Sequence, residues 1–183
     1  MNFKSSNESA TIFTELMIPS YANFGGKVHG GILLSLMDKV AYVVATKHSA
    51  AYCVTVAVEG VEFINPVEVG ELISVKAMVN YVGNTTMIIG MRVESLNPKT
   101  GVVKHTNSCY FTMAAKDDQG KLMQVPGLEI NNEKHLRRFA EGKALKEFSK
   151  AKRKMLKSDL NHLSVAEIKE QLKEEKVLFA ADL

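Results

Sequence analysis

Apolar residues recur in five separate stretches that are rich in β-branched and aromatic side chains, with glycine, proline or asparagine between them. Such stretches are typical of β-strands bounded by turns. The pair Gly83-Asn84, followed by two threonines, predicts a hairpin between the third and fourth stretches. The five predicted strands cover residues 10–18, 52–64, 71–82, 87–96 and 102–116.

One further apolar stretch, from Ile32 to about Lys47, is too long and too continuous for a strand or for a surface helix. We expect a mostly buried helix here. Its polar residues are spaced by three and four, so they fall on a single stripe that faces solvent or another polar environment. These residues are Ser35, Asp38, Lys39, Tyr42 and Thr46. One central helix and antiparallel strands joined by short turns predict an α+β fold, with a sheet in local meander pairing wrapped around the helix.

The amino-acid composition and the charge of the chain change near residue 130. We expect one domain over residues 1–130 and a helical C-terminal extension over 131–183. In the extension, apolar residues at near-helical spacing predict a helix within 132–157, and Ser164-Val165-Ala166-Glu167 fits a capping box that starts another helix. The net charge is −1 over residues 1–130, +7 over 131–157 and −3 over the remainder. An anionic group, such as a phosphate, would therefore bind to the basic part of the extension.

Composition narrows the class of protein. No run of about 18 apolar residues is present, and the first residues lack the apolar block of a signal peptide. The two cysteines, Cys53 and Cys109, lie in different predicted strands, which favours free buried thiols in a reducing cytosol. A cytoplasmic protein with no metal site, no bound cofactor and no membrane partner is therefore expected.

The start of the central helix carries the candidate chemistry. Gly30-Gly31 either lets a buried helix approach the sheet closely or presents free backbone N–H groups to a developing oxyanion. Asp38 lies two turns further along the same face. A carboxylate on a largely buried helix is costly unless it has a partner, so Asp38 is a candidate general base or nucleophile. In isolation, Asn23 and Thr85-Thr86 are ordinary turn and strand residues, while His29 is either a general acid or a helix cap.

Two ordered signatures within residues 10–130 resemble those of a known family. The first comprises Pro19, Asn23, Gly26, Gly30-Gly31 and Met37-Asp38, and the second runs from Val54 through Phe63 to Pro66-Val67-Glu68-Val69-Gly70. Together they are similar to the hotdog-fold acyl-CoA thioesterases of the cytosolic acyl-CoA hydrolase type. That resemblance implies a hotdog fold, in which an antiparallel sheet wraps around a long central helix.

The resemblance also implies roles for particular residues. Asn23 of one protomer and Asp38 of another would form the catalytic pair across a dimer interface, and the thioester carbonyl would bind at His29, Gly30 and Gly31. Coenzyme A would lie along Val56-Ala57-Val58 and Thr85-Thr86, with its phosphates near the basic residues Arg137, Arg138 or Lys143. The dimer would be the smallest active unit, in a trimer of dimers, and coenzyme A would enter only as part of substrate and product.

Three alternatives stay open at this point. His29-Gly30-Gly31 with Asp38 also fits the phenylacetyl-CoA type of hotdog thioesterase. A hotdog dehydratase would need a glutamate on the helix, where this chain has Asp38. A non-catalytic acyl-CoA-binding regulator could contact nucleic acid through residues 131–157, although a nucleic acid partner is not expected. The preferred acyl chain length and any regulation by nucleotides are not evident from the sequence.

Overall fold

The computed structural model describes residues 2–159 and 162–180 and forms two compact units, Met1–Lys143 and Ala144–Leu183. The first unit contains a central helix and all strands described, together with the beginning of α3. Its elements are β1 (Phe3–Ser5), α1 (Ser6–Ser9), β2 (Thr11–Leu16), the 3-10 turn η1 (Pro19–Tyr21), α2 (Gly30–Ser49), β3 (Tyr52–Phe63), β4 (Leu72–Val82), β5 (Thr86–Leu96), β6 (Val103–Lys116), β7 (Gly127–Glu129) and α3 (Glu133–Lys154).

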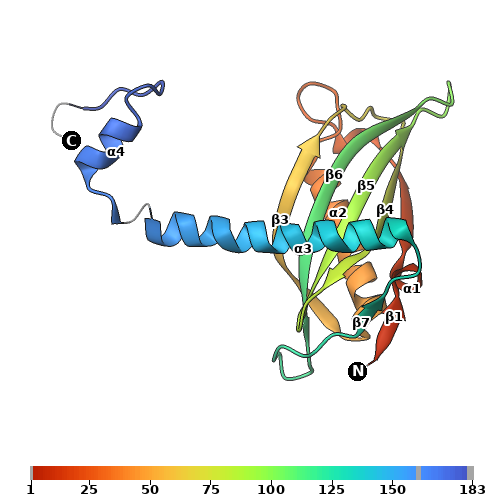
Figure 1. The fold of residues 1–183 in the computed structure, drawn as a ribbon. Coiled ribbons are helices and arrows are strands. Elements are labelled where there is room, and N and C mark those ends of the chain that lie inside the picture. Colours follow the sequence, from red (N-terminus) through yellow and green to blue (C-terminus); the bar gives the residue numbers. More distant parts are fainter. Residues whose placement is uncertain (1, 160–161, 181–183) are drawn as a thin grey trace. The chain divides into compact units, whose positions relative to one another are not determined.

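Five antiparallel strands form one sheet in the order β2-β4-β5-β6-β3, and this sheet curves around α2 (Figure 1). The predicted α+β architecture, with an antiparallel sheet around one long helix, is confirmed. Each of the five strands lies within one or two residues of its predicted bounds. The predicted hairpin is present as well, where the Gly83 N–H donates to the carbonyl oxygen of Thr86 at 2.7 Å.

The expectation of local meander pairing is correct only for β4, β5 and β6. β3 does not pair with β4; it lies at the far edge of the sheet and pairs with β6. The physical reason is the connection from Ile64 to Glu71, which is too long for a tight hairpin and is engaged elsewhere. Its Val67 is buried, and the Val67 carbonyl accepts a hydrogen bond from the Val28 N–H at 2.9 Å. The connection therefore crosses the structure instead of turning back beside β3.

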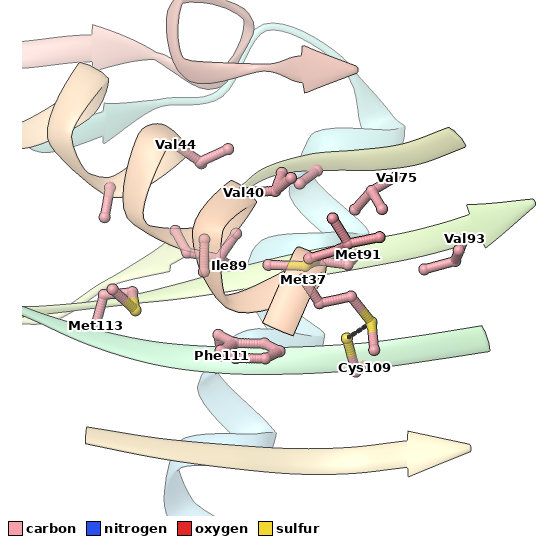
Figure 2. Packing of buried hydrophobic residues seen from close by; sticks show 14 of the residues in the cluster. Met37, Val40, Val44, Val75, Ile89, Met91, Val93, Cys109, Phe111 and Met113 are labelled. Atoms are coloured by element: carbon pink, nitrogen blue, oxygen red, sulfur yellow. Dashed lines mark hydrogen bonds between the residues drawn. The ribbon is translucent and has the colours of Figure 1, made fainter. Parts of the chain in front are cut away.

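The hydrophobic core lies between α2 and the sheet. Met37, Val40 and Val44 of the helix point toward strand side chains that include Ile89 and Phe111 (Figure 2). Full burial of side chains of this size contributes about 1.5–3 kcal/mol each to stability. The pattern follows from the sequence, because alternate residues of β4, β5 and β6 face the helix while the α2 residues at helical spacing face them.

Both cysteines are free thiols buried in this core, as predicted. Cys109 is fully inaccessible, and its Sγ–H group donates to the Met37 Sδ at 3.2 Å (Figure 2). Burial raises the pKa of the Cys109 thiol to about 12 and also raises that of Cys53. The two thiols therefore stay protonated and act as small apolar groups.

Three short elements were not predicted. β1 pairs in parallel with β7, and α1 follows β1 directly. The buried Ser6 of α1 makes a 3.0 Å hydrogen bond with the ring of His135 at the start of α3. Elements of three or four residues carry too few positions for a detectable periodicity, and their pairing is set by contacts between the two ends of the first unit.

The second unit contains the remainder of α3, a π-helical turn (Met155–Asp159) and α4 (Val165–Gln171). The predicted capping box is present: the Ser164 hydroxyl accepts from the Glu167 N–H, and the Glu167 carboxylate accepts from the Ser164 N–H. The part of the predicted extension that covers residues 160–161 and 181–183 lies outside the described residues. The predicted division of domains at residue 130 stays a prediction.

Acid is expected to destabilise the fold through His48, near the end of α2. This side chain is fully buried, and its Nε2–H donates to the Pro126 carbonyl at 3.1 Å. Burial lowers the pKa of His48 below its ordinary value of 6.5. The unfolded chain thus binds a proton more readily than the folded chain, so the stability due to neutral His48 is present above about pH 6.5 and falls below it.

The test is urea unfolding of the wild type and of His48→Gln between about pH 7.5 and about pH 5.5. Glutamine keeps a donor for the Pro126 carbonyl and does not titrate. The wild type should lose more unfolding free energy over this range than the variant does. Glu71, whose pKa is lowered on balance by hydrogen bonds despite the opposing effect of burial, titrates below this window. Parallel pH profiles for the two proteins would contradict the assignment to His48.

Candidate active site

Asn23 lies in a tight loop between η1 and α2. Its Oδ1 accepts hydrogen bonds from the N–H groups of Gly25 at 2.8 Å and Lys27 at 3.2 Å. Gly26 has a φ of +75°, a conformation that side chains other than glycine rarely adopt. Because the amide oxygen is engaged inside the loop, the Nδ2–H group of Asn23 is the part of the side chain left to donate to a ligand or partner.

The second sequence signature holds this loop in place. Lys27 and Glu68 form both a β-bridge and an ion pair, and the Val67 carbonyl accepts from Val28 as described above. Gly70, with a φ of +89°, turns the chain so that its N–H donates to the Met17 carbonyl. The two signatures lie apart in sequence but are one structural unit, since the second supports the loop that carries Asn23.

The N-terminus of α2 is capped by His29. Its Nδ1 accepts a hydrogen bond from the Gly31 N–H at 2.9 Å, so the cap interpretation of His29 is confirmed. A Cβ atom on Gly30 would lie 3.0 Å from the ring of Phe63, the last residue of β3. Gly30 therefore allows close packing, and the N–H groups of this turn also lie at the positive end of the helix dipole. The contacts support the close-packing explanation, whereas the oxyanion explanation stays a prediction, because the Gly31 N–H is not free but donates to His29 Nδ1.

Asp38 lies on the exposed stripe of α2. Its Oδ1 accepts a short hydrogen bond of 2.6 Å from the hydroxyl of Thr55 on β3. A shallow hollow of about 450 Å³ opens beside the carboxylate, and its lining is largely apolar. The residues that line it are Leu34, Ser35, Asp38, Val58, Val61 and Phe111. A carboxylate fixed by one hydroxyl at the mouth of an apolar hollow is suited to act on a substrate with an apolar part.

Thr55 is a residue that the sequence analysis did not single out. It contacts Asp38 across 17 positions of sequence, from a strand to a helix. A β-bulge follows it at once, because the register of β3 against β6 shifts between Thr55 and Ala57. Bulges commonly redirect a side chain beside an active site. No local pattern could have identified Thr55, since its role depends on the register of β3 beside α2.

The structure does not bring all predicted site residues together in one chain. Asn23, His29 and Gly30 line a different hollow, of about 630 Å³, in which Asp38 takes no part. Thr85 and Thr86 lie at the end of the sheet where β3 begins, whereas Gly30 packs against the end of β3. Lys143, on α3, lines neither hollow. A single chain thus holds two separate parts of the predicted site.

β3 is an edge strand of twelve residues with exposed apolar side chains. Val56 and Val58 are 51% and 42% exposed, and both belong to the segment predicted to bind coenzyme A. A long edge with apolar side chains is a ready template for pairing with another chain. It lies next to the exposed stripe of α2 that carries Asp38, so pairing here would cover the candidate site.

Among the described residues, no group of three or more histidine, cysteine, aspartate or glutamate side chains could hold a metal ion. Within the same part of the chain, no helix is both long and apolar enough to cross a membrane.

A long helix inside an antiparallel sheet, with a carboxylate at mid-helix and a glycine-rich entry, is the architecture of the hotdog class. The family model described as "Thioesterase superfamily" matches residues 25–102. Protein VdlD of Helicobacter pylori is 46% identical over 147 residues, which cover 80% of this chain and 83% of VdlD. The cytosolic acyl coenzyme A thioester hydrolase of Mus musculus is 32% identical over 79% of this chain, and the match spans 39% of that longer protein.

Solved structures agree with these matches. An apo-hexameric acyl-CoA thioesterase superposes with a TM-score of 0.81 at 31% identity, over 84% of this chain and 98% of the other. An acyl-CoA hydrolase from Staphylococcus aureus, solved with butyryl coenzyme A and coenzyme A, gives a TM-score of 0.79 at 26% identity, over 87% and 98% of the two chains. This protein belongs to the thioesterase superfamily, among the hotdog-fold acyl-CoA hydrolases.

The Staphylococcus aureus enzyme has also been solved as alanine variants of an asparagine, an aspartate and a threonine. These three positions are separated along that chain by the same intervals that separate Asn23, Asp38 and Thr55 in this one. The correspondence includes Thr55, whose contact with Asp38 was visible only in the structure.

Proposed function

We propose that this protein hydrolyses acyl-CoA to a free carboxylic acid and coenzyme A, with Asp38 as the catalytic carboxylate. The observation that carries the proposal is the fixed position of Asp38. Its Oδ1 accepts a hydrogen bond from the Thr55 hydroxyl, and the exposed carboxylate lies beside an apolar hollow. That arrangement leaves Oδ2 to accept a proton from a water molecule.

This geometry supports the following reaction. Asp38 takes a proton from water as the oxygen attacks the thioester carbonyl carbon, and the carbonyl π electrons move onto its oxygen. The resulting oxyanion is stabilised at the N-terminus of α2, where Gly30 and Gly31 lie and the helix dipole is positive. The Gly31 N–H would exchange its hydrogen bond to His29 Nδ1 for one to the oxyanion. When the intermediate collapses, the C–S bond breaks and the thiolate of coenzyme A receives the proton held by Asp38. Direct attack by the carboxylate is the second possible route.

The active unit is a dimer in which each site combines Asn23 of one protomer with Asp38 of its partner. Support comes from the separation of these residues into two hollows within one chain and from the exposed apolar edge of β3. Asn23, whose amide N–H remains available, would orient the water or the thioester. A trimer of such dimers is the expected assembly, in keeping with the hexameric thioesterase that this fold resembles.

Coenzyme A is proposed to lie along the exposed segment Val56-Ala57-Val58 and the strand start at Thr85-Thr86. The Staphylococcus aureus relative, solved with this ligand, supports the choice of ligand class. Lys143 is exposed on α3 and is the proposed contact for a phosphate group. The cytoplasmic location expected from the sequence stays a prediction.

The test is a thiol-release assay on the purified protein with a series of acyl-CoA substrates. The series runs from short to long saturated chains and includes phenylacetyl-CoA. We expect turnover to depend on chain length, because the hollow beside Asp38 is apolar and limited in volume. Preference for the aromatic substrate would assign the protein to the phenylacetyl-CoA type instead. Tight acyl-CoA binding without turnover of any substrate would favour a regulator and contradict the proposal.

A further inference from the structure

The C-terminal half of α3 and the π-helical turn after it carry an unusual concentration of positive charge. Residues 144–157 contain six lysine or arginine residues against a single glutamate, a net charge of +5. Within α3, Lys146, Lys150 and Arg153 are spaced by four and then three, so they share one face, with Lys154 beside them. Each of these four side chains is exposed.

Apolar side chains occupy the other side of the same helix. Phe148 is 66% exposed, and at 100° per residue it lies about 200° around the axis from Lys150. Met155 and Leu156, in the following turn, are 56% and 51% exposed. Most of the cations thus project on one side and the large apolar groups on the other; Lys152 is the exception, because it lies about 40° around the axis from Phe148.

We propose that this basic amphipathic segment, residues 144–157, docks the protein on an anionic membrane surface. A helix that lies in the plane of such a surface buries its apolar face among the acyl chains, while lysine and arginine side chains reach the lipid phosphates. The charge and the exposed Phe148, Met155 and Leu156 are satisfied together only by a partner that is anionic at its surface and apolar beneath it. The contact is peripheral, and it does not rest on the proposed activity.

Two other partners fit less well. A nucleic acid duplex would neutralise the cations but would leave Phe148, Met155 and Leu156 in water, because its outer surface is the charged backbone. A second copy of the helix would cover the apolar face but would leave the cations, which project on the opposite side, without an anionic partner. The charge pattern thus favours an anionic lipid surface.

The experiment is vesicle co-sedimentation of the full chain, with phosphatidylcholine alone or mixed with phosphatidylglycerol. Binding should be at least about tenfold stronger to the anionic vesicles and should weaken when salt is raised from about 0.1 M to about 0.5 M. Lys150→Glu/Lys154→Glu should reduce that binding about tenfold or more. The matched control, Lys99→Glu/Lys121→Glu, makes the same change of charge at two exposed positions of the first unit and should bind like the wild type.

Phe148→Ser separates the lipid surface from the other partners. It should weaken vesicle binding at both salt concentrations, because the apolar contribution is not screened. Equal binding to both kinds of vesicle, or equal losses in Lys150→Glu/Lys154→Glu and its control, would overturn the proposal. So would salt-dependent retention on duplex DNA that Phe148→Ser leaves unchanged, or a change of oligomeric state as the main effect of Phe148→Ser. Unchanged hydrolysis of a short acyl-CoA by each variant checks folding.

Discussion

Replacing Asp38 with alanine should lower kcat for acyl-CoA hydrolysis by about 10²–10⁴-fold, the range typical of removing a general acid or base. The carboxylate lies on the exposed stripe of α2 and takes no part in the core, so the fold and the oligomer should persist. Thiol release under saturating substrate measures the effect, and circular dichroism with analytical ultracentrifugation checks the structure.

Two matched variants separate chemistry from positioning. Asp38→Asn keeps the size of the side chain and an oxygen for the Thr55 hydroxyl but cannot take a proton, so it should lose about as much activity as alanine. Thr55→Val removes only the hydroxyl that holds Oδ1, and it should lower kcat less, by about tenfold. Asp38→Ala retaining activity within a factor of about ten would rule out Asp38 as the catalytic carboxylate.

Mixing two inactive variants should restore activity if each site is shared. Asn23→Ala and Asp38→Ala protein, dissociated and reassociated together in equal amounts, form mixed dimers. In a mixed dimer one site carries both changes, while the other has an intact Asn23 and an intact Asp38. With random pairing, about one quarter of wild-type activity should return from two preparations that each have almost none.

This outcome depends on the twofold arrangement and on nothing else in the mechanism. The control is to mix either variant with itself under the same treatment, which should restore no activity. The double variant Asn23→Ala/Asp38→Ala mixed with wild type provides a second control, since those mixed dimers have two defective sites. If Asn23 and Asp38 serve the same site from one chain, mixing the single variants would restore no activity, and the shared-site proposal would fail.

Much of this fold could be predicted from the sequence because the signals are local and repeated. The apolar run of α2 and its polar stripe follow from spacing, and the structure leaves Ser35, Asp38, Lys39 and Tyr42 exposed as that stripe requires. The fifth predicted member of the stripe, Thr46, does not fit, because it is only partly exposed and its hydroxyl is buried. The strands follow from alternation between turn residues. The capping box at Ser164 was predicted correctly because both of its partners lie within four consecutive residues.

The remainder depends on contacts that no local pattern encodes. Pairing of β3 with β6, instead of β4, is decided by the connection that supports the Asn23 loop. Thr55 reaches Asp38 only because the register and bulge of β3 place it there. Likewise, β1 and β7 come from distant parts of the sequence, and no local pattern predicts that they pair. The proposed catalytic pairing of Asn23 with Asp38 is likewise beyond any local pattern, because it would involve a second chain.

The state of the two cysteines has a consequence for an enzyme of this kind. Each turnover would release coenzyme A, a thiol that forms mixed disulfides with accessible protein thiolates. Cys109 is fully buried with its pKa raised to about 12, and burial also raises the pKa of Cys53. Neither sulfur offers an accessible thiolate, so the product cannot cap the enzyme covalently. The protein is thereby insulated from the redox chemistry of its own leaving group.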